Sequence, residues 1–206
     1  MKNRYWTLVA AIAIGAATAG VFVARNLNQP AAVQLESGTA LPTPGELSAF
    51  SLVDTRNAAF TPAEFRGHPT LVFFGFTNCP DVCPTTLALL ASVQKKIQVP
   101  GLQVALISVD PERDTPEHLG KYVASFGSEF IGLTGQAPEI VKAQRSFGVA
   151  SARVDLAGGG YTMDHSATVF VLDSAGRKVA IFTPPLRADA LGRDLAKLLP
   201  TPGGKS

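Results

Sequence analysis

The only two cysteines in the chain, Cys79 and Cys83, stand four positions apart. The segment 71–74 before them is wholly apolar, and Pro84 behind them opens a stretch with helical spacing of its apolar residues. Two thiols at such a strand-to-helix turn can form a structural disulfide, act as a redox dithiol, or serve as two soft metal ligands. A disulfide across so short a loop constrains little of the unfolded chain, so the two reactive roles are favoured.

The spacing of the two cysteines argues against two related redox classes. Thioredoxin-type oxidoreductases have two residues between their cysteines, whereas this chain has three. A peroxiredoxin would carry Thr or Ser three positions before its reactive cysteine, where this chain has Phe76 and Pro80. The helix start beside Cys83 favours a thiolate there, because free N–H groups and the helix dipole stabilise negative charge.

A metal site built on two thiolates would take a third ligand, for which neutral imidazole is the obvious donor. His68 lies in a Gly-His-Pro turn and His118 on the polar side of an amphipathic helix, so both are expected to be solvated surface groups. His165 stands at the entry to a buried strand, which a thioredoxin-like fold would bring against the cysteine turn. From the residues alone, a lone loop histidine is more often structural than a ligand. Asp164 beside it could orient a ligand imidazole or cap a turn.

Strands and helices alternate along the segment that contains these residues. A short hairpin is expected around residues 50–57 and a glycine-rich loop at 158–160. Buried strands are expected at 70–75, 103–109, 130–133 and 167–172, a further strand at 178–182, and helices after 84, after 115, over 137–147 and around 191–199. This order predicts an α/β, thioredoxin-like fold with a central mixed sheet flanked by helices and right-handed parallel crossovers.

The N-terminal region predicts a membrane anchor. Residues 6–24 are 19 uncharged positions, close to the length that spans a bilayer core. Lys2 and Arg4 precede this run and only Arg25 directly follows it, which places the N-terminus in the cytoplasm and the rest outside. We therefore predict an anchor over residues 1–25, a single span of a bacterial inner membrane with the soluble domain in the periplasm. A signal peptide cleaved after residues 17–19 is the alternative.

The rest of the chain divides into a linker, one domain and a tail. Residues 26–45 hold several prolines and glycines without an apolar period, which predicts a flexible linker. A single domain is expected over 46–200, since 206 residues with 46% apolar content can bury one good core, and residues 201–206 are expected to be disordered. A net charge of +2 without a basic stripe argues against nucleic-acid binding.

The motifs, in their order, resemble those of the SCO/SenC family of thioredoxin-like copper proteins. The resemblance covers about residues 45–199 and is carried by segments 73–86, 107–116, 132–135 and 164–166. It implies that Cys79, Cys83 and His165 bind copper. For His165 it therefore favours the role of a ligand over the structural role that the residues alone favour. Two thiolates select Cu(I), and an added imidazole also accommodates Cu(II). Residues 110–115 share the family pattern, but a loop and a helix cap explain them, so they receive no ligand role.

The predicted anchor and the resemblance together imply a membrane-tethered copper metallochaperone rather than an enzyme. By the resemblance, it assists assembly of the binuclear copper centre of cytochrome c oxidase. The implied partners are the copper-bearing oxidase subunit, another periplasmic copper chaperone and a thiol reductant. The alternative is a thiol-disulfide oxidoreductase that reduces cysteines of an oxidase subunit or another copper carrier through Cys79 and Cys83. Thioredoxins have a cis-proline where this chain has residues 165–167, which argues against general disulfide exchange.

Overall fold

The computed structural model of the chain describes residues 15, 20, 33–97 and 99–199. Contacts divide the chain into two units, residues 1–32 and 33–206. Of the first unit only Gly15 and Gly20 are described, both in helical conformation. Apart from these two glycines, the predicted anchor lies outside the described residues, as does the predicted tail. No helix within the described part is long and apolar enough to cross a membrane.

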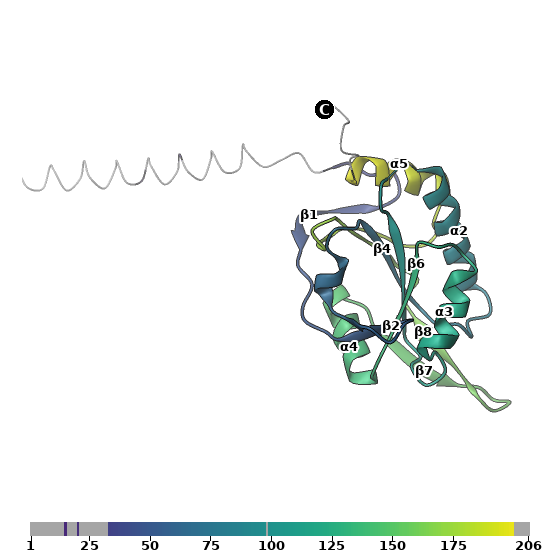
Figure 1. Cartoon of the computed structure of the whole chain (residues 1–206). Helices are drawn as coiled ribbons and strands as arrows, with labels where there is room; N and C mark the ends of the chain where they lie inside the picture. Colours follow the sequence, from purple (N-terminus) through teal and green to yellow (C-terminus); the bar gives the residue numbers. More distant parts are fainter. Residues whose placement is uncertain (1–14, 16–19, 21–32, 98, 200–206) are drawn as a thin grey trace, which may run out of the picture. The chain divides into compact units, whose positions relative to one another are not determined.

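The described part of the second unit is an α/β domain built on an eight-stranded mixed sheet with a separate two-stranded ribbon (Figure 1). The order of the large sheet is β1-β10-β9-β4-β5-β6-β2-β3, and β7 pairs with β8 in the ribbon. The strands are β1 (Thr39–Gly45), β2 (Leu52–Asp54), β3 (Ala59–Phe60), β4 (Thr70–Gly75), β5 (Gln103–Ser108), β6 (Phe130–Thr134), β7 (Ser151–Asp155), β8 (Tyr161–His165), β9 (Val169–Leu172) and β10 (Lys178–Phe182). The helices are the short 3-10 helix Pro62–Phe65, α2 (Val82–Lys96), α3 (Pro116–Ala124), α4 (Ala137–Phe147) and α5 (Ala188–Leu198).

The centre of the sheet is buried on both faces. Strand β4 pairs in parallel with β5 and antiparallel with β9, so that Phe73 lies opposite Leu106 on one side and Val169 on the other. All six residues of β4 are buried, as expected for an apolar strand covered on both sides. Figure 1 shows α2 and α3 on one side of the sheet and α4 on the other. The predicted α/β class, with a mixed sheet flanked by helices, is confirmed.

The predicted linker over residues 26–45 is wrong for its last part. Residues Thr39–Gly45 form β1, an edge strand that pairs antiparallel with β10, with Thr39 opposite Ile181. The prolines that indicated a linker are compatible with this position, because an edge strand has one side without ladder hydrogen bonds. The folded domain therefore begins before residue 46.

Helix α5 fixes the entry to β1. The buried carboxylate of Asp194 accepts hydrogen bonds from the backbone N–H groups of Glu36 at 2.7 Å, Ser37 at 2.8 Å and Gly38 at 3.3 Å. A Cβ on Gly38 would lie 2.4 Å from the Phe182 ring, so only glycine allows this close approach. These long-range contacts cannot be read from the local composition of the segment.

The glycine-rich loop predicted at residues 158–160 is confirmed as a turn, but the two strands that it joins, β7 and β8, were not predicted. Gly159 and Gly160 have positive φ values of 86° and 77° and make the turn between the two strands. The strands themselves are short, and none of their residues is fully buried. They therefore lack the apolar run or clear alternation by which the central strands of the main sheet were predicted.

Candidate metal site

The cysteine turn joins β4 to α2. Helix α2 begins at Val82, two residues before the predicted start at Pro84, and proline is tolerated there because first-turn N–H groups have no acceptor within the helix. Cys83 is thus buried in the first turn of α2, while Cys79 lies half-buried in the loop before it. The backbone N–H of Cys83 donates to Cys79 Sγ at 3.4 Å, which holds the two residues together.

His165, the last residue of β8, lies beside this turn although it comes 82 positions after Cys83 in the chain. Its Nε2 lies 3.4 Å from Cys83 Sγ, and one candidate ligand atom from each of Cys79, Cys83 and His165 falls within 4.8 Å of the others. Its Nδ1 lies 3.2 Å from the carbonyl oxygen of Ser166. Because a carbonyl can only accept, this contact puts the proton on Nδ1 and leaves the Nε2 lone pair facing the sulfur. The structure therefore brings the three predicted residues into one cluster.

Two phenylalanines orient the imidazole. The rings of Phe73 and Phe76 meet His165 edge-on, with centroids 5.9 Å and 5.7 Å away. Both rings are buried, so they close the inner side of the site. The cluster is not sealed from solvent, because Cys79 and His165 are both only half-buried. A cavity of about 340 Å³ lies on the ribbon beside His165 and is lined in part by Ser151, but neither cysteine lines it.

Asp164 does not take the role predicted for it. Successive side chains of a strand point to opposite faces, and Asp164 is exposed whereas His165 is half-buried. Within the described residues no hydrogen bond joins the Asp164 carboxylate to His165, and the Ser166 carbonyl makes that contact instead. His68 and His118 are exposed, as expected, although His118 Nε2 also lies 3.0 Å from the Thr77 hydroxyl.

Asp114 supports the cysteine turn and was missed at the sequence level. It is buried, and its carboxylate accepts hydrogen bonds from the Thr77 N–H at 3.1 Å, the Thr77 hydroxyl at 2.5 Å and the Ser108 hydroxyl at 2.6 Å. The helix cap expected in the same loop is also present, since Thr115 Oγ1 accepts from the His118 N–H. The helix cap accounts for Thr115 but not for the polar residues before it. The carboxylate of Asp114, left without a role by the cap, was the available sign of a buried hydrogen-bond network.

Gly75 leaves the space that the Cys83 sulfur occupies. A Cβ at position 75 would lie 2.8 Å from Cys83 Sγ and 2.9 Å from the Phe73 ring, closer than real Cβ contacts allow. The last residue of β4 must therefore be glycine for the sulfur to sit beneath the strand end. The apolar pattern that predicts β4 carries no information about this requirement.

Burial dominates the electrostatics of the buried thiol. It raises the pKa of Cys83, and although a hydrogen bond with the Phe76 backbone opposes the rise, Cys79 and Asp114 add to it. The helix start was expected to favour a thiolate, but desolvation in this position outweighs that effect. Cys83 is therefore a thiol in the metal-free protein, and a bound metal must displace its proton.

The three donors suit a soft metal ion. Two sulfurs and one imidazole nitrogen favour copper or zinc over hard cations such as Mg²⁺ or Ca²⁺. A structural zinc site would more often have four protein ligands. A mixed thioredoxin-like sheet with this cluster at the end of its central strand defines a class of proteins that carry a soft-metal or redox centre on that fold.

The SCO1/SenC family model matches residues 40–200, and the chain belongs to this family. It is 37% identical over 137 residues to an SCO2-like protein of Rickettsia prowazekii, covering 65% of this chain and 67% of the relative. The structure of Arabidopsis thaliana ScoI with copper bound superposes with a TM-score of 0.71 at 32% identity, covering 74% of this chain and 97% of that one. Bradyrhizobium japonicum ScoI with copper bound gives a TM-score of 0.67 at 38% identity, with 74% and 99% covered.

Proposed function

We propose that this chain is a copper metallochaperone that holds the metal through Cys79 Sγ, Cys83 Sγ and His165 Nε2. The observation that carries the proposal is the convergence of these three ligand atoms within 4.8 Å. The donor chemistry supports it, because thiolates select Cu(I) and imidazole extends the site to Cu(II). The two ScoI structures with copper bound support copper as the metal.

The half-buried positions of Cys79 and His165 support transfer of the metal over permanent storage. A site with three protein ligands leaves room for a donor atom of a partner to enter before a ligand of the chaperone leaves. In line with its family, the chain would deliver copper to the binuclear centre of cytochrome c oxidase, with the copper-bearing oxidase subunit as partner. An anchor over residues 1–25 would hold the domain on the periplasmic side of the membrane.

A thiol-disulfide oxidoreductase is the second candidate function. The two sulfurs lie within 4.8 Å, and Cys79 is half-buried and can be reached by a partner. In that reaction the two thiols would give two electrons to a partner disulfide and become a Cys79–Cys83 disulfide themselves. Because a disulfide has no thiolate to offer, oxidation of the pair and copper loading exclude each other.

A Cu(I) titration of the reduced full chain against a competing chelator tests the proposal. We expect one copper per chain, and an affinity that falls by more than about 100-fold in His165→Ala, beyond the usual loss for an outer-shell partner. His68→Ala, which removes an exposed histidine outside the cluster, should behave like wild type. Wild-type affinity in His165→Ala, or no copper bound by the reduced chain, would refute the metallochaperone proposal and leave the redox function.

A further inference from the structure

The strand that carries His165 is not paired with the main sheet. It belongs to the β7–β8 ribbon, whose hydrogen-bond ladder runs from Ser151 opposite His165 to Asp155 opposite Tyr161. A two-stranded ribbon alone is marginally stable in water. Side-chain contacts between the ribbon and the rest of the domain must therefore hold the histidine in place.

Tyr161 and His165 are the two ends of one face of β8. They are four residues apart, so their side chains point the same way and their Cα atoms are about 13 Å apart. Met163 lies between them on this face and packs against the buried core. The face is thus attached at its middle by Met163, and Tyr161 determines how its far end lies.

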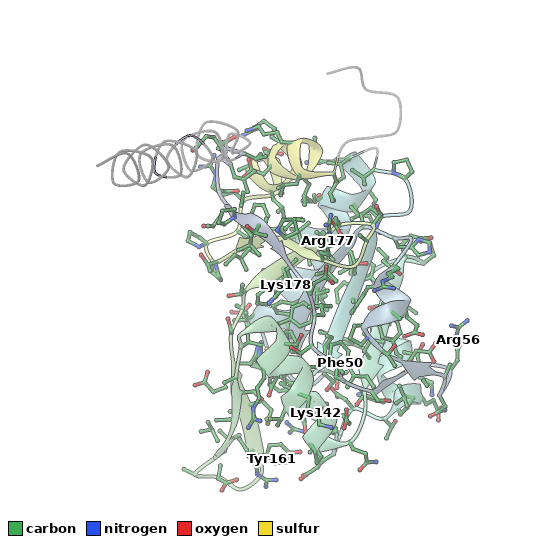
Figure 2. The ribbon with its side chains drawn as sticks, turned by 90° about the vertical axis from the view of Figure 1, so that its left-hand side faces the viewer. Phe50, Arg56, Lys142, Tyr161, Arg177 and Lys178 are labelled. Carbon is green, nitrogen blue, oxygen red and sulfur yellow. The ribbon has the colours of Figure 1, made fainter. Side chains whose placement is uncertain are left out.

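Two arginines stack on the ring of Tyr161. The guanidinium carbon of Arg113 lies 3.8 Å from the ring centroid and that of Arg153 lies 3.7 Å from it, so the two groups must occupy opposite faces. The Tyr161 hydroxyl donates to Asp110 at 2.8 Å, and Arg113 Nη1 donates to the Tyr161 carbonyl at 3.0 Å. Figure 2 shows Tyr161 at the lower end of the domain, on the ribbon. We call Asp110, Arg113 and Tyr161 the latch.

The charges of Arg113 and Asp110 in the latch neutralise each other. Arg113 Nε pairs with the Asp110 carboxylate, whose side chain is only 2% exposed. Burial and the hydrogen bond to Asp110 raise the pKa of Tyr161 to about 12, so the phenol stays a donor at neutral pH. A cation over an aromatic ring is a stabilising contact, and more so where water is excluded. The latch can therefore hold the free end of the ribbon.

The loop that carries Asp110 and Arg113 of the latch also holds the cysteine turn. Asp114, next to Arg113 in the chain, accepts two hydrogen bonds from Thr77. The Arg113 guanidinium carbon lies 5.8 Å from the centroid of Phe76, whose ring packs against His165. Residues 110–114 thus contact both the segment that carries the cysteines and the ribbon that carries the histidine.

We infer that Arg113 and Tyr161 are positioning residues for His165, and that loop 110–114 sets the distance between the histidine and the cysteine pair. The inference rests on the proposed function only in so far as it names copper as the metal. Neither residue supplies a ligand atom. Both act through the orientation of β8.

A double-mutant cycle in the full chain tests this directly. Tyr161→Leu should lower Cu(I) affinity by about 10-fold, the order found when an outer-shell partner is lost. In the His165→Ala background the same change should have no effect, because the latch acts through His165. An equal loss in both backgrounds would show a general structural effect and overturn the inference, as would wild-type affinity of Tyr161→Leu.

A matched pair of arginines separates the latch from any loss of an ion pair. Arg113→Met breaks a pairing with Asp110 in the latch, and Arg56→Met breaks the pairing of Arg56 with Asp54 on the β2–β3 hairpin. Only Arg113→Met should lower copper affinity. Equal effects of the two substitutions would contradict a specific role of the latch.

The metal-free reduced chain provides a readout that does not depend on copper. In wild type the His165 imidazole should give one sharp set of NMR resonances, and in Tyr161→Leu these should broaden or double while those of His68 stay unchanged. Tyr161→Phe keeps the ring between the two guanidinium groups and should retain most of the wild-type behaviour. Unchanged His165 resonances in Tyr161→Leu would overturn the inference. If the wild-type chain bound no copper, the proposed function would fail while this comparison still decided the role of the latch.

Discussion

Cys83 Sγ and His165 Nε2 lie 3.4 Å apart although 82 positions separate the two residues. Cys83 is held by the first turn of α2 beneath the end of β4, and His165 by a ribbon outside the main sheet. The cysteine pair is therefore a local feature of one turn. The third residue of the cluster, His165, comes into place only when the ribbon packs against the rest of the domain. The affinity for metal should depend on this docking as much as on the ligands.

The two cysteines should differ strongly in reactivity. Cys79 is half-buried, whereas Cys83 is buried and its pKa is raised by burial. Because the thiolate is the reactive form, iodoacetamide at pH 8 should modify Cys79 of the reduced, metal-free chain at least about 10-fold faster than Cys83. Peptide mass spectrometry over a time course measures both rates. Equal rates, or faster modification of Cys83, would contradict this description of the turn.

Gly75→Ala should disturb the cysteine turn. The new Cβ would lie 2.8 Å from Cys83 Sγ, and such overpacking typically costs about 1–3 kcal/mol of unfolding free energy. It should also displace the sulfur and weaken copper binding. Gly192→Ala in α5 is the matched control, because its Cβ would meet Ile97 at an ordinary 3.4 Å, and alanine there should add about 0.5–1 kcal/mol. Urea unfolding measures both, and equal stability of Gly75→Ala and wild type would count against the close contact.

Asp114→Asn should destabilise the domain. The amide presents an NH2 group where one of the two carboxylate oxygens was, so the Thr77 N–H and the Thr77 and Ser108 hydroxyls can no longer all donate to position 114. A loss of about 1–3 kcal/mol in unfolding free energy is expected. Asp164→Asn, at an exposed position without a hydrogen bond to His165, should change both stability and copper affinity little. A smaller effect at position 114 than at 164 would be incompatible with the hydrogen bonds described.

Asp194 should make the stability of the domain depend on acid pH. Burial alone would raise the pKa of its carboxyl, but hydrogen bonds from Glu36, Ser37 and Gly38 outweigh this and lower it. A lowered pKa in the folded state stabilises the fold above the unfolded value of about 3.9. That stabilisation is lost as the pH falls through the folded value. The advantage of wild type over Asp194→Asn should therefore be largest near neutral pH and shrink as the pH falls below about 4.

Urea unfolding at several pH values measures this advantage. Asp189→Asn is the control in the same helix, because the Asp189 side chain is 75% exposed and its pairing with Lys96 contributes little. A difference between wild type and Asp194→Asn that stayed constant from pH 7 to acid would argue against the lowered pKa.

The centre of the fold could be predicted because its residues permit little else. Segment 70–75 is almost wholly apolar and becomes β4, and the predicted helix over 137–147 matches α4 in both bounds. Such elements are determined by their own residues, through burial on both faces or an apolar stripe at helical spacing. The prediction succeeded where local pattern and burial agree.

The elements that were missed depend on distant partners. Asp194, far along the chain, holds the segment that leads into strand β1. The prolines of this strand were interpreted as the sign of a linker. The ribbon needs the latch and has little apolar pattern of its own. For the site, the cysteine spacing indicated the chemistry, but the residues alone gave His165 only modest weight, and the family resemblance selected it. Gly75 acts through a close contact that leaves no mark in the local sequence, and Asp114 acts through a buried network of which its carboxylate was the only local sign.

X-ray absorption at the copper edge tests the central claim most directly. In the loaded full chain we expect two sulfur scatterers and one imidazole nitrogen, at about 2.2–2.3 Å and 2.0 Å by analogy with other thiolate and imidazole metal bonds. His165→Ala should lose the imidazole nitrogen and keep both sulfurs, while His68→Ala keeps all three. A copper centre with sulfur ligands alone in the wild-type chain, or an imidazole signal that survives in His165→Ala, would contradict the three-ligand site.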